Sequence, residues 1–349
     1  MAAGTTAPRR DRIEPLWDRI DQTRLKVGLF IALFILAAAA SLALMVAVAG
    51  VFFGWIVLAR GANTGLLTAL PFLTVGAGLV GAGLAAVHVN RMLTRPEERL
   101  PGLFGAVPVQ RGTLPQTESA LKDMAIAVGQ PNGPWLWLID DCDRINAFAL
   151  GIEDSRLVVG VTRGFLDRLS VDDQRAVFAN LMARVRSGDT LWATVITAIM
   201  GPIWQQRATQ LATDDTLQGD EGTWTNALTG GIAGATAREN PEAVVGVFVL
   251  GFLGVVLTEL LMAGHERAAL AAAEKADAEG MMLLKDPEQM LSSLATVLEA
   301  NNTVPGAWEA YSSLFFCWAG FGYAPEDDPE MERLGRLREV LGAAGAQTA

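Results

Sequence analysis

The strongest constraint on this chain comes from two long apolar runs near its start. Residues 27–59 contain no charged side chain, and residues 64–90 repeat the pattern. A helix needs about 20 apolar residues to cross the hydrocarbon core of a bilayer, so both runs are predicted to span a membrane. The first run exceeds the apolar core of a signal peptide and has no evident cleavage site, which indicates a retained anchor.

Two further apolar runs lie in the second half of the chain. Residues 190–204 form a shorter run that contains Pro202, whereas residues 243–264 are apolar over a full span apart from Glu259. Glu259 lies close enough to the end of its run to reach water. We therefore predict about four transmembrane helices, of which the third is the shortest.

A glycine pattern within the second run resembles a nucleotide-binding motif. The segment Gly76-Ala-Gly78-Leu-Val-Gly81 satisfies G-x-G-x-x-G. A dinucleotide site requires this pattern between a strand and a helix at a soluble crevice, whereas this one lies inside a predicted span. Close packing of helices through small residues is the better interpretation.

Basic residues indicate how the predicted spans are oriented. The outer ends of the first two runs are flanked by Arg9, Arg10, Arg12, Arg19, Arg24 and Lys26 and by Arg91, Arg95 and Arg99. Basic residues are retained on the cytoplasmic side, so the N-terminus and the main soluble region are predicted to face the cytoplasm at the cell inner membrane. Ahead of the first span, an amphipathic helix with Ile13, Leu16, Trp17 and Ile20 on one face is predicted on the inner surface; a partner-binding helix is the alternative.

Charge and cysteine content exclude several function classes. The formal net charge is −11, and no basic cluster outside the membrane flanks offers a face for phosphates, so nucleic acid is excluded as a partner. Cys142 and Cys317 are far apart in sequence and form neither a disulfide framework nor a zinc-binding pair. The composition therefore indicates the bilayer as a partner and argues against nucleic acid.

The soluble region reads as short strands followed by a helix. Strands are predicted at Trp135–Ile139, Asn146–Leu150 and Arg156–Thr162, separated by turns. Ser170-Val-Asp-Asp173 has the form of a capping box, and the helix that follows should end near Gly188. The predicted fold is mainly α with a small antiparallel β-sheet, an α+β soluble domain attached to the membrane helices.

Several segments of this region, in order, resemble one family. Asn146-Ala-Phe-Ala-Leu-Gly151 looks like an N-A-F-A-x-G hairpin, and residues 161–170 look like the segment that leads into an active-site helix. Residues 276–278 with 286–288 are similar to an E-x-x-A-D region, and residues 329–337 to a C-terminal P-x-x-x-R-x-x-x-L helix. Together they resemble the HtpX-like membrane zinc metallopeptidases, whose wider group includes the CAAX prenyl proteases.

The resemblance, with the apolar runs, implies a division of the chain into five parts. These are a cytoplasmic tail (1–26), spans one and two (27–93), a first peptidase-like part (94–188), spans three and four with an external connection (189–264), and a second peptidase-like part (265–349).

The family's zinc chemistry depends on an H-E-x-x-H helix and a downstream glutamate. Alignment of the flanking segments places Asn180, Leu181 and Arg184 on the three H-E-x-x-H positions and Ala273 on the downstream one, with Glu274 one residue off. Asparagine is a poor zinc ligand, leucine takes no proton, and arginine stays cationic and repels the ion. Among the matched site positions, Asp277 retains its residue type. The resemblance thus implies a zinc fold from which catalytic residues, metal ligands and cofactor are lost.

The two histidines of the chain permit one alternative metal site. His88 and His265 both follow predicted cytoplasmic ends of spans, and together with Glu266 they would offer three ligands at the membrane surface. Histidines at membrane boundaries are more often interfacial side chains, so we favour that interpretation.

The main hypothesis is a non-catalytic, HtpX-like pseudopeptidase that binds a polypeptide segment or a membrane protein. The sheet edge at Asn146, Ala147, Phe148 and Ala149 is the expected peptide-binding surface, since a strand can be added through main-chain hydrogen bonds without zinc; a buried hairpin is the alternative. Arg184 is expected to replace the zinc charge by pairing with Asp277 or Glu274. The rivals are an active metalloendopeptidase with an atypical zinc site, and a subunit that partners an intact HtpX-type enzyme.

Overall fold

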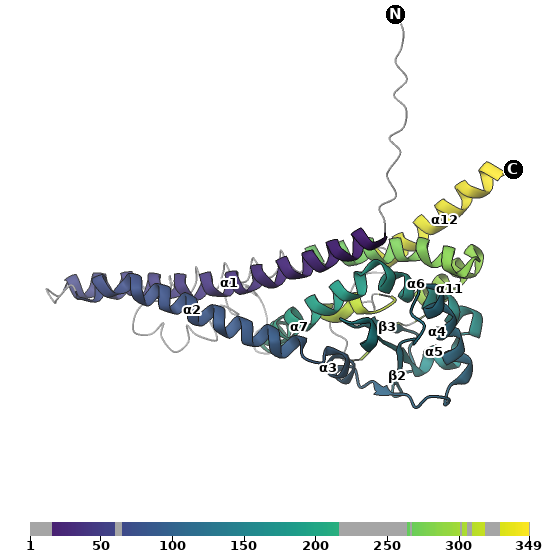
Figure 1. Cartoon of the computed structure of the whole chain (residues 1–349), viewed down its shortest axis with the longest axis horizontal. Coiled ribbons are helices and arrows are strands. Elements are labelled where there is room, and N and C mark those ends of the chain that lie inside the picture. Colours follow the sequence, from purple (N-terminus) through teal and green to yellow (C-terminus); the bar gives the residue numbers. More distant parts are fainter. Residues whose placement is uncertain are drawn as a thin grey trace, which may run out of the picture.

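A computed structural model describes most of the chain. The described residues are 16–59, 65–215, 264–265, 267–300, 302–305, 309–317 and 329–348. A long helical hairpin projects from a globular domain (Figure 1). Almost all of the predicted fourth span, and residues 1–15 of the predicted amphipathic tail, lie outside the described residues.

The hairpin consists of α1 (Leu16–Ala59) and α2 (Gly65–Leu93), which lie side by side. Each contains a segment long and apolar enough to cross a membrane, Gln22–Ala59 and Thr68–Leu93. Large apolar side chains point outward along both helices, as Phe72 at 81% exposure shows, which suits contact with lipid. The first two predicted spans are therefore present as helices. α1 runs from Leu16 into its span without a break, so Leu16, Trp17 and Ile20 of the predicted surface helix belong to α1.

Small residues allow the two helices of the hairpin to approach closely. A Cβ atom added at Gly81 would lie 2.9 Å from the Ala38 carbonyl oxygen, and one at Gly78 would lie 3.5 Å from the Ala43 side chain. Gly76 faces open space. The glycine pattern of α2 thus serves helix packing at two of its three positions, as predicted.

The sheet of the globular domain is mixed, which corrects the antiparallel prediction. Its strands are β1 (Val107–Pro108), β2 (Trp135–Ile139), β3 (Ala147–Leu150) and β4 (Val158–Thr162), in the order β1-β2-β4-β3. β3 pairs antiparallel with β4 as expected, but β2 pairs with β4 in parallel. The chain that follows β2 crosses the position of β4. β3 therefore pairs with the edge of β4 that faces away from β2.

Helices cover both faces of this sheet. Along the chain, α3 (Pro96–Leu103) precedes β1, α4 (Pro115–Ala127) lies between β1 and β2, and η1 (Asp154–Arg156) lies between β3 and β4. After β4, the short helix α5 (Arg163–Arg168) leads into α6 (Val171–Ser187). Ser170 caps α6 in a reciprocal capping box with Asp173, and Gly188 ends it with a φ of 82°, which a residue without Cβ adopts at no steric cost. The predicted active-site helix is confirmed at both ends.

The third apolar run forms part of α7 (Asp189–Asp215) and packs inside the protein. Val195 and Ile199 are buried in a cluster that also contains Phe148 and Leu150 of β3. Within the described part of the chain, α1 and α2 alone have the length and composition of a membrane span. The prediction of a third span is not confirmed, because the apolar face of α7 is occupied by the sheet.

The second half of the domain is helical and closes the other face. Residues 267–284 form a helix, followed by α11 (Pro287–Glu299), η2 (Glu309–Leu314) and α12 (Pro329–Thr348). Alternate residues of β4 point to different clusters: Val159 and Val161 pack with α6 and α11, whereas Val158 packs with α7 and η2. Two cores therefore lie on opposite faces of one small sheet.

Candidate functional site

The degenerate H-E-x-x-H positions lie on α6 where it packs against helix 267–284. Asn180 is fully buried, and its side-chain Nδ2 donates a hydrogen bond of 2.7 Å to Oδ1 of Asp277. Gly280 allows the close approach, since a Cβ added there would lie 3.1 Å from the backbone nitrogen of Asn180. Leu181 is a core residue in the cluster between the sheet and α11. The structure thus brings Asn180 and Asp277 together.

Asp277 is held by a second residue, Arg333 of α12. The Arg333 guanidinium donates to both carboxylate oxygens, at 2.5 Å from Nε and 2.7 Å from Nη2, and also to the Phe316 carbonyl. Both side chains of the pair are 1% exposed. Burial alone would lower the pKa of Arg333, but the charge and hydrogen bonds of Asp277, with the charge of Glu330, raise it above its ordinary value.

Arg184 does not pair with Asp277 or Glu274, which corrects the expected ion pair. Its guanidinium is buried and donates to the carbonyl oxygens of Phe315, at 2.8 Å, and Ser313. Arg333 already occupies Asp277, and Glu274 faces Arg336 at 2.8 Å on the outer side of its helix. Burial, followed by repulsion from Arg333, lowers the pKa of Arg184 to about 10, so Arg184 remains a cation at neutral pH.

The expected peptide-binding edge is covered by the chain's own residues 313–317. Phe316 donates its backbone N–H to the Ala147 carbonyl at 2.7 Å, and Phe315 forms an antiparallel bridge with Phe148. The Asn146 side chain binds both the carbonyl and the N–H of Cys317. The four residues Asn146, Ala147, Phe148 and Ala149 are accordingly all buried. The structure has the buried hairpin that was the alternative, and peptide binding at this edge stays a prediction.

The two histidines have separate partners. His88 Nε2 lies 3.2 Å from the Ile199 carbonyl oxygen, and His265 Nε2 lies 2.9 Å from Oγ of Ser313. Glu266 lies outside the described residues. Among the side chains that the structure describes, no group of three or more His, Cys, Asp or Glu is arranged to hold a metal ion.

The residues at the family's zinc position do not fit zinc. Asn180 turns its amide nitrogen, a donor, toward the acid, and Arg184 brings a positive charge. Ala273 offers no ligand atom, and the ion pair with Arg336 keeps Glu274 on the outside of the helix, as its predicted one-residue offset requires. Asp277, the remaining acid, has both oxygens bound by Arg333. In this arrangement the described side chains bind carbonyl groups of the chain's own backbone and the Asp277 carboxylate.

The sequence pointed to the P-x-x-x-R segment but not to the role of its arginine. Arg333 joins α12, helix 267–284 and residue 316, and Ser313 joins Arg184 to His265. One signal was available: Asp277 and Arg333 both keep the residue type of the family, each in a different matched segment. A retained acid and a retained base often form a pair. Ser313 had no such signal. The thiols of Cys142 and Cys317 are buried, and burial raises the pKa of both, so neither is a nucleophile at neutral pH.

Acid is expected to destabilise the domain through His265. Burial lowers the pKa of His265 to about 4, below its ordinary 6.5, so the unfolded state binds more protons between these values. The free energy of unfolding should fall by about 3 kcal/mol as the pH drops from 7 through 4, because one pKa unit corresponds to about 1.4 kcal/mol. Urea unfolding of wild type and His265→Gln at several pH values measures this difference. An identical pH slope in both proteins would contradict a buried neutral imidazole.

Comparisons with known proteins match this chain to one peptidase family and to several HtpX homologs. The family model described as peptidase family M48 matches residues 113–339. A protease HtpX homolog of Limosilactobacillus reuteri is 25% identical over 249 residues, which cover 70% of this chain and 77% of that protein. A protease HtpX homolog of Trichormus variabilis is 27% identical over 145 residues, covering 41% and 50%, and one of Sulfurihydrogenibium sp. is 29% identical over 149 residues, covering 42% and 50%.

Proposed function

Because the chain belongs to peptidase family M48, we propose that it is a non-catalytic member of this family. It acts as a membrane-anchored, HtpX-like protein that binds a polypeptide segment or a membrane protein without cleaving it. The main support is the environment of Arg184: a buried guanidinium stands at a zinc-ligand position and is bound to two backbone carbonyls. A cation held in this way disfavours a divalent ion at the same place.

The neighbouring positions support the same proposal. Hydrolysis by this family requires an electrophilic metal and a carboxylate base next to its bound water. Leu181 stands at the position of the base and is packed into the core, while Asn180 donates a hydrogen bond to Asp277. The hydrogen bond of Asn180 joins α6 to helix 267–284, and Leu181 contributes to the core, so both positions stabilise the domain without providing a reaction site.

The edge of β3 is the part of the site through which we propose polypeptide binding. Residues 313–317 occupy this edge through main-chain contacts of the kind that a partner strand would make. A partner strand has to displace them, and the bonds from Arg184 to Ser313 and Phe315 oppose that displacement. Arg184 therefore sets how readily the edge opens.

A proteolysis assay tests the proposal. We expect the purified full-length protein, supplied with zinc, to leave an unfolded casein intact whether or not a metal chelator is present. Cleavage that the chelator stops, and that is lost in His88→Ala or His265→Ala, would establish the rival metallopeptidase. Arg184→Ala serves as the matched control, since cleavage unaffected by this variant would not arise at the M48 position. Copurification of an intact HtpX-type enzyme from native membranes would instead indicate an accessory subunit.

We further propose that the peptidase-like domain faces the cytoplasm at the inner membrane. Arg91, Arg95 and Arg99 follow the apolar part of α2 where it joins the domain, and basic residues favour the cytoplasmic side. A single cysteine placed at exposed Lys122, in a variant without the native thiols, should resist membrane-impermeant maleimide in intact spheroplasts. Labelling before the membrane is opened would contradict this orientation.

A further inference from the structure

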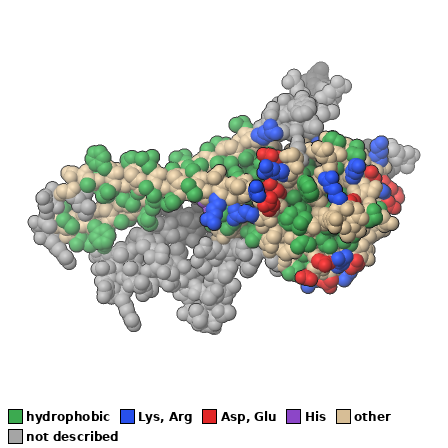
Figure 2. Space-filling view, turned by 60° about the horizontal axis from the view of Figure 1, so that its bottom comes forward, with side chains coloured by type: hydrophobic (Ala, Val, Ile, Leu, Met, Phe, Trp, Pro, Cys, Tyr) green, Lys and Arg blue, Asp and Glu red, His purple; other side chains and the backbone are tan. Residues whose placement is uncertain are grey.

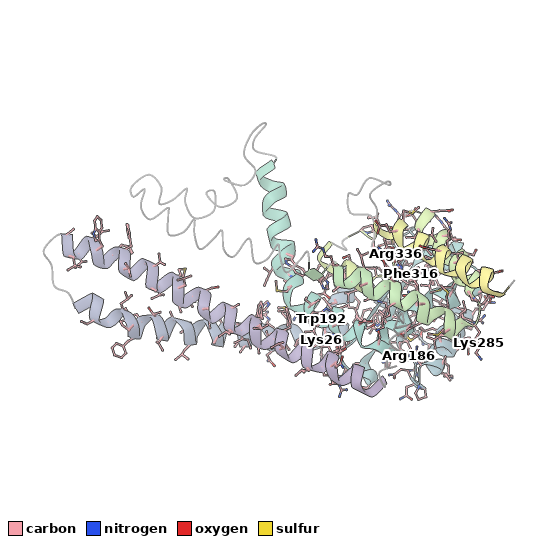
Figure 3. All side chains as sticks on the ribbon, turned by 90° about the horizontal axis from the view of Figure 1, so that it is seen from above. Lys26, Arg186, Trp192, Lys285, Phe316 and Arg336 are labelled. Carbon is pink, nitrogen blue, oxygen red and sulfur yellow. The ribbon has the colours of Figure 1, made fainter. Side chains whose placement is uncertain are left out.

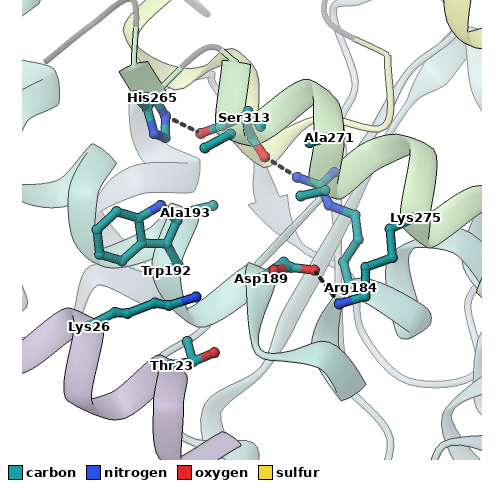
Figure 4. A pocket seen from close by; sticks show the side chains of 13 residues that line it. Thr23, Lys26, Arg184, Asp189, Trp192, Ala193, His265, Ala271, Lys275 and Ser313 are labelled. Carbon is teal, nitrogen blue, oxygen red and sulfur yellow. Dashed lines mark hydrogen bonds and ion pairs between the residues drawn. The ribbon is translucent and has the colours of Figure 1, made fainter. Parts of the chain in front are cut away.

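A cavity lies between the start of α1, the start of α7 and helix 267–284 (Figure 4). Its volume is about 350 Å³, and alanines between positions 268 and 272 form one wall. The charged residues that line it are Lys26, Arg184, Lys275 and Asp189. Nζ of Lys275 lies 3.9 Å from Oδ2 of Asp189, and Lys26 has no ion-pair partner among the described residues. The charged side chains therefore leave an excess of positive charge around a space large enough for a small anion.

Two buried nitrogen atoms at this cavity lack partners. Nε of Arg184 and Nδ1 of His265 form no hydrogen bond within the described part of the chain. The two side chains are 4% and 6% exposed, and both line the cavity. A buried polar group without a partner costs about 1–3 kcal/mol, so such groups are normally satisfied by protein, water or ligand. Both atoms are themselves shielded from solvent, so what the two residues offer the cavity as it stands is the positive charge of Arg184.

The position of the cavity along α1 identifies the source of the anion. Lys26 lies in the first turns of the Gln22–Ala59 segment, and the neighbouring Leu25 and Leu29 are 73% and 58% exposed. Apolar side chains cover the hairpin, and Lys, Arg, Asp and Glu appear where it meets the globular domain (Figure 2). The labelled Lys26 and Trp192 lie at this junction (Figure 3). Phospholipid headgroups lie at the corresponding boundary of a bilayer, and basic side chains attract the anionic ones.

We propose that this cavity binds the phosphate group of an anionic phospholipid. Lys26 and Lys275 bind the phosphate oxygens, and the buried cation of Arg184 adds positive charge behind them. Trp192 and the alanines of the cavity wall contact the apolar part of the lipid that adjoins its headgroup. The proposed lipid site does not require the loss of peptidase activity. The residues around the cavity form it, and Arg184 is the one degenerate zinc position among the lining residues.

Native mass spectrometry of the full-length protein tests this site. The protein is released from nanodiscs that contain phosphatidylcholine and phosphatidylglycerol, and the lipids that stay bound are counted. We expect wild type to retain one phosphatidylglycerol molecule in preference to phosphatidylcholine. Lys26→Gln/Lys275→Gln should weaken this preference roughly tenfold, the change that corresponds to about 1.4 kcal/mol of binding free energy. Arg24→Gln is the matched control on the same helix, because Arg24 does not line the cavity.

Three results distinguish a specific lipid site from general attraction to the membrane surface and from binding of free phosphate. Loss of preference in the double variant but not in Arg24→Gln, with an unchanged thermal midpoint, supports the proposal. An equal loss in both would show general attraction to the membrane surface and would overturn it. In detergent without lipid, inorganic phosphate should raise the thermal midpoint of wild type only weakly; stoichiometric binding of free phosphate with no lipid preference would overturn the assignment to a lipid.

Discussion

Replacing Asp277 with alanine is expected to lower the free energy of unfolding by roughly 3–5 kcal/mol, the cost of leaving one partner of a buried ion pair uncompensated. Arg333 is 1% exposed and has both carboxylate oxygens of Asp277 as acceptors. The same change removes the acceptor of Asn180 Nδ2. Urea denaturation of the protein in detergent, followed by tryptophan fluorescence, measures the loss.

Two variants control for the size and the charge of the deleted group. Asp277→Asn keeps the shape but removes the charge, so most of the loss should persist. Glu274→Ala removes the acid three positions earlier on the same helix, whose partner Arg336 is solvent-exposed, and should change stability only slightly. If Asp277→Ala and Glu274→Ala unfold at the same urea concentration, Asp277 is not the centre of a buried network.

Replacing Arg184 with alanine is expected to loosen residues 313–317 from the edge of β3. Each buried carbonyl that loses its donor, on Ser313 and Phe315, should cost about 1–3 kcal/mol. Because these bonds are local, hydrogen exchange at the Phe316 amide, which binds the Ala147 carbonyl, should accelerate more than exchange elsewhere. Hydrogen–deuterium exchange mass spectrometry of the peptide that contains residues 309–317 measures this effect.

The matched control for Arg184 lies two residues further along the same helix. Arg186 pairs with Glu279 at 3.1 Å and forms no hydrogen bond with the described residues 313–317, so Arg186→Ala should leave exchange at Phe316 unchanged. Arg184→Lys, which keeps a cation but has no planar fork for two carbonyls, should give an intermediate rate. Unaltered exchange in Arg184→Ala would show that the segment stays on β3 without the guanidinium.

Local signals in the sequence predicted the elements that depend on neighbouring residues. The capping box at Ser170 and the glycine at 188 defined α6 because both act within one turn of the helix end. The first two membrane helices followed from uninterrupted apolar runs. The third run had a similar composition, but periodicity cannot separate a helix buried by its own domain from one buried by lipid.

Contacts between distant segments could not be predicted in the same way. Strands of five residues joined by turns suggest hairpins, so the parallel pairing of β2 with β4 was missed. The acceptors of Arg184 lie 129 and 131 residues away, in a segment to which no element had been assigned. An arginine near two acids suggested an ion pair, yet Arg333 holds Asp277 more closely, and backbone carbonyls satisfy the remaining cation.

We propose that the M48 zinc position is a hydrogen-bonded contact between α6, helix 267–284 and residues 313–317. Zinc content, measured by inductively coupled plasma mass spectrometry after incubation with zinc and gel filtration, tests this claim most directly. We expect much less than one zinc per chain in wild type, with no change in His88→Ala or His265→Ala. One tightly held zinc per chain that is lost on replacing Asn180 or Asp277 would contradict the claim.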